Sequence, residues 1–109
     1  MTDIEAMVAA LREFRDERDW AQFHNAKDLA IALSVEANEL LEIFLWKSPR
    51  DAELNRVREE LADVFAFALL LADKYGLDVR AIVEDKLAAN RVKYPVEKAK
   101  GSAKKYDEL

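Results

Sequence analysis

The sequence contains no cysteine, and only two glycines and two prolines among its 109 residues. The absence of cysteine excludes disulfides and thiolate chemistry, and nothing in the composition indicates an oxidising compartment. So few glycines and prolines argue against a turn-rich β-sandwich and against a disordered chain. The longest apolar run, residues 64–72, is much shorter than the about 20 residues that a membrane helix needs. Because the first residues are acidic and resemble no signal peptide, we expect a cytoplasmic protein without a membrane partner.

Charge is distributed unevenly along the chain. The formal net charge is −5, but residues 86–105 hold seven cations and one anion. This segment therefore carries +6 and the remaining chain −11. The acidic bulk argues against binding of a nucleic acid polymer, which requires surface cations that neutralise phosphates. The basic segment suits a small polyanion held between cations and metal ions, and the ordinary alternative is a solvated basic tail.

Apolar periodicity and capping residues predict an all-α fold. Hydrophobic side chains recur at helical spacing, and no strand pattern is present. Capping residues precede each expected helix, and Gly76 supplies the left-handed stop of the third. The capping residues are Thr2, Asn25, Ser48 and Asp78, and the helices are expected over residues 4–14, 26–46, 49–75 and 79–93. The start of the third helix at Ser48-Pro49 also allows an irregular first turn. We expect a domain of the four-helix-bundle type over residues 1–95 and a basic, irregular C-terminal tail over 96–109.

Two pairs of carboxylates occupy unusual positions on the second and third helices. Glu36 and Glu39 are three residues apart, as are Glu60 and Asp63, so each pair lies on one helical face. Glu36 falls inside the apolar stripe of its helix, whereas Glu42 falls on the solvent side. Glu60 and Asp63 project from a helix that is apolar nearly all round. An ionised carboxylate in such surroundings costs several kcal/mol unless it is compensated.

The compensating group that fits best is Mg²⁺, which prefers carboxylate and phosphate oxygens. Zinc would require histidine or cysteine ligands, and the chain has one histidine and no cysteine. The Glu-x-x-His motif of ferritin-like di-iron sites is also absent. The alternative is an internal salt-bridge network with arginine or lysine from neighbouring helices.

The apolar third helix must in either case be buried, in its own bundle or against another subunit. We therefore expect a homodimer or homotetramer.

The chain resembles the MazG-like, all-α nucleoside triphosphate pyrophosphohydrolases, particularly their small dCTP pyrophosphatase-like branch. Three motifs occur in the order typical of that family: E-x-x-E at 36–39, E-x-x-D at 60–63 and K-x-x-x-N-R-x-x-Y-P at 86–95. Shorter matches at 13–14, 19–20, 23–24, 45–47 and 101–106 extend the resemblance over nearly the whole chain.

The resemblance implies Mg²⁺-dependent hydrolysis of a (deoxy)nucleoside triphosphate to the monophosphate and pyrophosphate, as a house-cleaning activity. It implies that the four carboxylates Glu36, Glu39, Glu60 and Asp63 are the catalytic metal ligands. It implies that the phosphates are bound by Lys86, Asn90, Arg91, Lys93 and Tyr94. It implies that the base and sugar are bound by Trp20, His24, Trp46 and Phe67.

Two positions differ from relatives that prefer dCTP. Leu11 stands where those relatives tend to have histidine, and Phe67 where they tend to have tyrosine. Both differences remove hydrogen-bonding groups, so the resemblance does not extend to tight dCTP selectivity. The residues alone allow other roles: packing for Trp20 and Trp46, and capping or packing for His24. The alternative function is a non-catalytic helical oligomer or a nucleotide-binding module with a structural acidic core.

Overall fold

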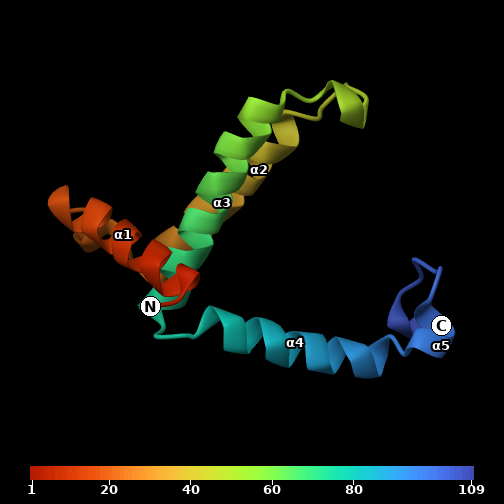
Figure 1. Cartoon of the computed structure of the whole chain (residues 1–109). Helices are drawn as coiled ribbons and strands as arrows, with labels where there is room; N and C mark the ends of the chain where they lie inside the picture. Colours follow the sequence, from red (N-terminus) through yellow and green to blue (C-terminus); the bar gives the residue numbers. More distant parts are fainter. The chain divides into compact units, whose positions relative to one another are not determined.

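The structure is a computed structural model that describes residues 1–109, and it is helical without strands (Figure 1). The all-α prediction is therefore confirmed. The chain divides into two compact units, Met1–Leu77 and Asp78–Leu109. The first unit holds α1 (Asp3–Glu17), η1 (Ala21–Phe23), α2 (Ala26–Glu42), η2 (Pro49–Asp51) and α3 (Leu54–Lys74). The second holds α4 (Val79–Lys93), α5 (Val96–Ala99) and η3 (Tyr106–Glu108), where η denotes a 3₁₀ helix.

The capping residues start three helices as the sequence predicts. Thr2 and Glu5 form a reciprocal capping box, with hydrogen bonds of 3.0 and 3.1 Å between side chain and backbone. The side chains of Asn25 and Asp78 accept hydrogen bonds from backbone N–H groups in the first turns of α2 and α4. At the end of the first unit, Gly76 adopts a φ of +64°, the left-handed conformation that glycine adopts without steric cost.

The connection between α2 and α3 is longer than expected, so two predicted helix boundaries are wrong. α2 ends at Glu42 instead of Trp46, and turns follow it up to Trp46, whose φ is +62°. Ser48 precedes a 3₁₀ turn instead of α3, because the extended backbone of Ala52 and Glu53 breaks the helix before Leu54. A Ser-Pro pair suits the first turn of either kind of helix, so local preference does not distinguish them. The expected irregular tail also contains α5 and η3.

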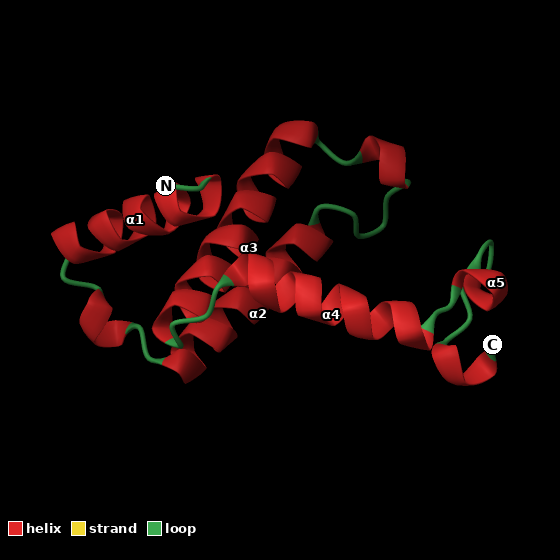
Figure 2. Ribbon diagram, turned by 60° about the horizontal axis from the view of Figure 1, so that its bottom comes forward, coloured by secondary structure: helices red, strands yellow, loops and turns green.

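α2 and α3 form a helical hairpin, and α1 packs against α3 in the same unit (Figures 1 and 2). The buried core of this unit is small and apolar, and it consists of Leu29, Ile43, Leu69, Leu70 and Ala72. A charged contact adds to the packing of α1, since the Arg12 guanidinium donates two hydrogen bonds to Asp73 near the end of α3. These contacts fix the α2–α3 pair that carries the predicted carboxylates.

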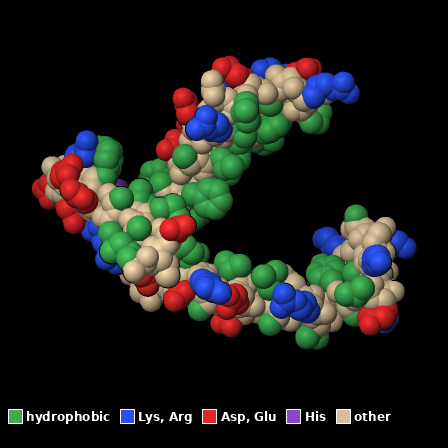
Figure 3. Space-filling view, viewed as in Figure 1, with side chains coloured by type: hydrophobic (Ala, Val, Ile, Leu, Met, Phe, Trp, Pro, Cys, Tyr) green, Lys and Arg blue, Asp and Glu red, His purple; other side chains and the backbone are tan.

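α3, the third predicted helix, is only partly buried within a single chain. The sequence alone left open whether it is buried in its own bundle or against another subunit. The side chain of Phe65 is 60% exposed and that of Leu61 is 40% exposed. Hydrophobic side chains remain visible along the α2–α3 hairpin (Figure 3). One chain therefore leaves part of the apolar surface of α3 uncovered, and the predicted self-association stays a prediction. None of the helices combines the length and apolar character needed to span a membrane.

Candidate metal centre

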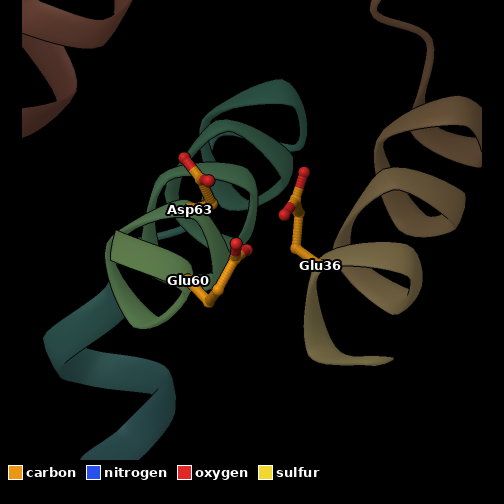
Figure 4. Close-up of side chains that lie close together, drawn as sticks. All are labelled: Glu36, Glu60 and Asp63. Atoms are coloured by element: carbon orange, nitrogen blue, oxygen red, sulfur yellow. The ribbon is translucent and has the colours of Figure 1, made fainter. Parts of the chain in front are cut away.

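Three carboxylates from two helices converge between α2 and α3. Glu36 projects from α2, and Glu60 and Asp63 project from α3 toward the same space (Figure 4). One oxygen from each of the three lies within 4.8 Å of the others. The i, i+3 spacing places Glu60 and Asp63 on one face of α3, and the hairpin brings that face against Glu36. The predicted convergence of carboxylates across two helices is thus present in the fold.

Glu39 lies beside this group, one turn after Glu36 on α2. It is half-buried, and it is within hydrogen-bonding reach of both Glu36 and Glu60. Its oxygens are not part of the closest set of three. The fourth predicted ligand therefore adjoins the cluster and contacts it from the α2 side.

The negative charges of the cluster are not compensated by the protein. The four ion pairs of the chain, Arg12–Asp73, Arg15–Asp16, Arg18–Glu17 and Arg80–Glu84, all lie elsewhere. One oxygen each of Glu36 and Glu60, Oε2, is buried without a hydrogen-bond partner. An internal salt-bridge network, the structural alternative raised by the sequence, is therefore not formed in this chain.

This electrostatic environment raises the pKa values of two of the carboxyl groups. Burial is the largest cause for Glu36 and, with a hydrogen bond to Glu39 and the charges of Glu39, Asp63 and Glu60, raises its pKa to about 7. The pKa of Glu60 is raised first by burial and then by its contacts with Glu39 and Asp63. Burial and mutual repulsion that raise carboxyl pKa values would be relieved by a cation bound between these groups.

The donor set fits a hard divalent cation. All side chains in the cluster offer carboxylate oxygens, which Mg²⁺ prefers, and none offers nitrogen or sulfur. Glu36 and Glu60 each have one buried oxygen without a hydrogen-bond partner. Such unpaired acceptors are uncommon in folded proteins, and coordination of a cation would satisfy them. Glu36, Glu60 and Asp63 could hold the ion, with Glu39 adjacent to it.

The raised pKa of Glu36 predicts how stability varies with pH in metal-depleted protein. The folded state holds this proton more tightly than the unfolded state, where the ordinary value is 4.5. The resulting stabilisation is complete below pH 4.5 and is lost as the pH rises through about 7. The free energy of unfolding should therefore fall between pH 5 and 8, and it should fall less in a Glu36→Gln variant.

Urea denaturation of both proteins at several pH values measures this difference. His24 acts in the opposite direction, because burial and the charges of Arg15 and Lys74 lower its pKa from 6.5. Since His24 is present in both proteins, its contribution cancels in the comparison. Parallel pH profiles for the two proteins would contradict the prediction.

The residues predicted to bind phosphate share one helix in the second unit. Lys86, Asn90, Arg91 and Lys93 lie on α4, and Tyr94 is its C-cap. The Lys93 ammonium lies 4.9 Å from the ring centroid of Tyr106, whose edge-to-face partner is Tyr94 at 6.2 Å. None of the three cations takes part in an ion pair. The fold therefore leaves their positive charges available to a ligand.

The four residues predicted for the base and sugar are not brought together within one chain. Trp20 packs edge-to-face on Phe14 at 5.8 Å, beside the guanidinium of Arg18. Trp46 is completely exposed after α2, and Phe67 is half-buried on α3. Trp46 lies beyond the end of α2 and not on it, because the helix ends at Glu42.

His24 lies in a pocket that the sequence did not predict. The cavity measures about 290 Å³ and is lined by side chains from the first unit, chiefly Arg15, His24, Leu29, Leu70, Asp73 and Lys74. These side chains come from three helices and one connection, so no periodic pattern in the sequence joins them. The only local feature that could have pointed to this pocket is Asp73, a carboxylate that directly follows the apolar run of α3.

A sequence model of the MazG-like family matches residues 31–109 of the chain. The protein belongs to the MazG-like family. All four carboxylates and all five predicted phosphate-binding residues lie inside the matched range, whereas Trp20 and His24 precede it.

Individual relatives extend the match to most of this MazG-like chain. It is 40% identical over 105 residues to dCTP pyrophosphatase 1 of Rattus norvegicus, and 40% identical over 107 residues to that of Homo sapiens. Both alignments cover 89% of this chain, but the chain spans only 62% of each relative's length. The crystal structure of a pyrophosphatase from Archaeoglobus fulgidus DSM 4304 superposes with a TM-score of 0.80 at 38% identity. That comparison covers 87% of this chain and 94% of the archaeal one.

Proposed function

We propose that this MazG-like protein is a Mg²⁺-dependent pyrophosphohydrolase of (deoxy)nucleoside triphosphates that removes surplus or altered nucleotides from the cellular pool. The observation that carries the proposal is the cluster of Glu36, Glu60 and Asp63, which has buried oxygens without partners and no protein cation to neutralise it. The names of the mammalian relatives and of the archaeal neighbour, which are pyrophosphatases, support the same reaction.

In this proposal the carboxylates of the α2–α3 pair hold Mg²⁺. The bound metal would neutralise phosphate charge and favour attack of water at the α-phosphorus. Glu39 adjoins the cluster without belonging to its closest set of three. We therefore assign Glu39 the role of general base, which accepts a proton from the attacking water. A bond then forms between this water oxygen and the α-phosphorus, and the bond from the α-phosphorus to the departing pyrophosphate breaks. No covalent nucleophile is required, because phosphoryl transfer depends mainly on positioning and electrostatics.

We also propose that polar groups of α4 bind phosphate groups of the substrate. Lys86 and Arg91 offer positive charge to the phosphates, and Asn90 is the half-buried polar group between them. Arginine suits this role because its planar guanidinium matches two phosphate oxygens at once. Lys93 and Tyr94 extend the same polar end of the helix.

We further propose that a second copy of the chain helps to form the site for the base and sugar. Trp20, Trp46 and Phe67 lie apart within one chain, and Trp46 is fully exposed. The exposed side chains of Phe65 and Leu61 on α3 offer an apolar surface for a homodimer or homotetramer. Light scattering on the purified protein measures this directly, and a particle of monomer mass would contradict it.

Incubation with a panel of nucleoside and deoxynucleoside triphosphates tests the reaction. In the presence of Mg²⁺, we expect at least one substrate to yield its monophosphate and pyrophosphate in equal amounts. Omitting the divalent metal should abolish the release. Pyrophosphate formation from none of the substrates, or release of orthophosphate instead, would contradict the proposal and favour a non-catalytic role.

A further inference from the structure

The pocket around His24 is separate from the metal cluster. Its apolar wall contains Leu29 of α2 and Leu70 of α3. Leu29 precedes Glu36 by seven residues, and Leu70 follows Asp63 by seven. Seven residues correspond to about 10 Å along a helix axis, so the pocket lies about two helical turns from the carboxylates. Its volume of about 290 Å³ is at the lower end of the range for small-molecule sites.

Positive charge in this pocket exceeds the negative charge that the protein places there. The carboxylate of Asp73 is already engaged by two hydrogen bonds from Arg12. Arg15 uses only its Nε, which donates to Asp16 at 2.8 Å, so its two terminal nitrogens have no protein partner. Lys74 takes part in no ion pair. The Arg15 side chain is only 21% exposed, so water solvates it incompletely.

His24 provides a second observation that favours binding of an anion in this pocket. Its Nδ1 is buried without a hydrogen-bond partner, an arrangement that is uncommon in folded proteins. Burial lowers its pKa, and the nearby charges of Arg15 and Lys74 lower it further. Asp73, the one carboxylate in the pocket wall, attracts Arg15 through space, but it accepts its hydrogen bonds from Arg12 and none from Arg15 or Lys74. An anion in the pocket would counter both effects.

We propose that this pocket binds the oxyanion of a small phosphate-bearing ligand, with the terminal nitrogens of Arg15 and the ammonium of Lys74 as donors. A guanidinium whose two terminal nitrogens are free can donate hydrogen bonds to two phosphate oxygens at once. Leu29 and Leu70 cover the less polar part of the ligand. The ligand is either inorganic phosphate or a phosphate monoester, and both present the same group to these donors. The pocket shares no residue with the metal cluster, and it includes His24, which the resemblance places at the base and sugar.

The single histidine of the chain provides a specific probe of this pocket. NMR signals of the His24 imidazole are followed while metal-depleted full-length protein is titrated with inorganic phosphate or ribose 5-phosphate. Potassium chloride at equal ionic strength serves as the reference. We expect the signals to shift saturably with at least one phosphate compound, and the pKa of His24 to rise in its presence. A response to inorganic phosphate shows that the free anion suffices, whereas a response to ribose 5-phosphate alone shows that an organic body is required.

Charge-removing variants connect the response to the pocket. Arg15→Gln and Lys74→Met should each weaken phosphate binding by about tenfold or more, as expected when a charged hydrogen bond is lost. Arg50→Gln and Lys47→Met remove exposed cations outside the pocket, and they should leave the affinity within about twofold. Lys74 is exposed at the end of α3, so Lys74→Met tests the site even if Arg15→Gln unfolds. No saturable shift with either compound, or equal binding by the pocket variants, would overturn the proposal.

Discussion

Replacing Glu36 with glutamine is expected to lower metal-dependent pyrophosphate release by at least about 100-fold, a loss of about 2.7 kcal/mol of transition-state stabilisation. The substitution keeps the size of the side chain and removes the charge that would bind the cation. Glu36 also stands at the contact between α2 and α3, where its Oε2 is buried without a partner. The measurement is kcat/KM for the best triphosphate of the panel at saturating Mg²⁺.

Glu42→Gln is the matched control for this experiment. Glu42 lies on the same helix, but it is exposed and takes part in no ion pair. Its substitution removes one negative charge from α2 without touching the cluster, so kcat/KM should remain within about twofold. Full activity of Glu36→Gln, or an equal loss in both variants, would exclude the cluster as the catalytic centre.

Mg²⁺ is expected to stabilise the wild-type protein strongly against heat. A ligand present at 100 times its dissociation constant stabilises the folded state by about 2.7 kcal/mol. For a domain of this size, that corresponds to a rise in Tm of about 10 °C. The double variant Glu36→Leu/Glu60→Leu should show no rise, because two of the three clustered carboxylates are absent. Calorimetry with and without the metal gives both values.

The metal-free double variant distinguishes a metal site from a structural acidic core. The pKa values of Glu36 and Glu60 are raised by burial, so their ionisation at pH 8 opposes folding. Leucine of similar volume removes this penalty, and the double variant should melt at or above the temperature of the metal-free wild type. A Tm of the wild type that does not change with Mg²⁺ would favour the non-catalytic alternative.

Local sequence features were sufficient to predict most helix starts. Thr2, Asn25 and Asp78 cap the helices as expected, because a capping hydrogen bond involves atoms only two or three residues apart. The helix end expected at Trp46 and the helix start expected at Pro49 were wrong. Their positions depend on how the chain turns between two packed helices, which neighbouring residues alone do not specify.

The carboxylate pairs were recognisable from the sequence because they break the amphipathic pattern of their own helices. Glu36 falls among apolar positions, and a period of 3.6 residues makes that anomaly visible without a structure. The sequence also indicated that Glu60 and Asp63 share a face. The sequence favoured a metal site over a salt-bridge network, but it did not contain the distance between the two helices that decides between them.

The all-α class, three of the four helix caps and the faces that carry the acidic residues follow from the sequence, since they depend on contacts within one or two helical turns. The packing of α2 against α3 is what brings Glu36 to Glu60 and Asp63 with no lysine or arginine paired to them. The tertiary structure also places Arg15, His24 and Lys74 around one pocket. Both arrangements join residues far apart in the chain, and their proximity depends on the packing of whole helices against a shared core.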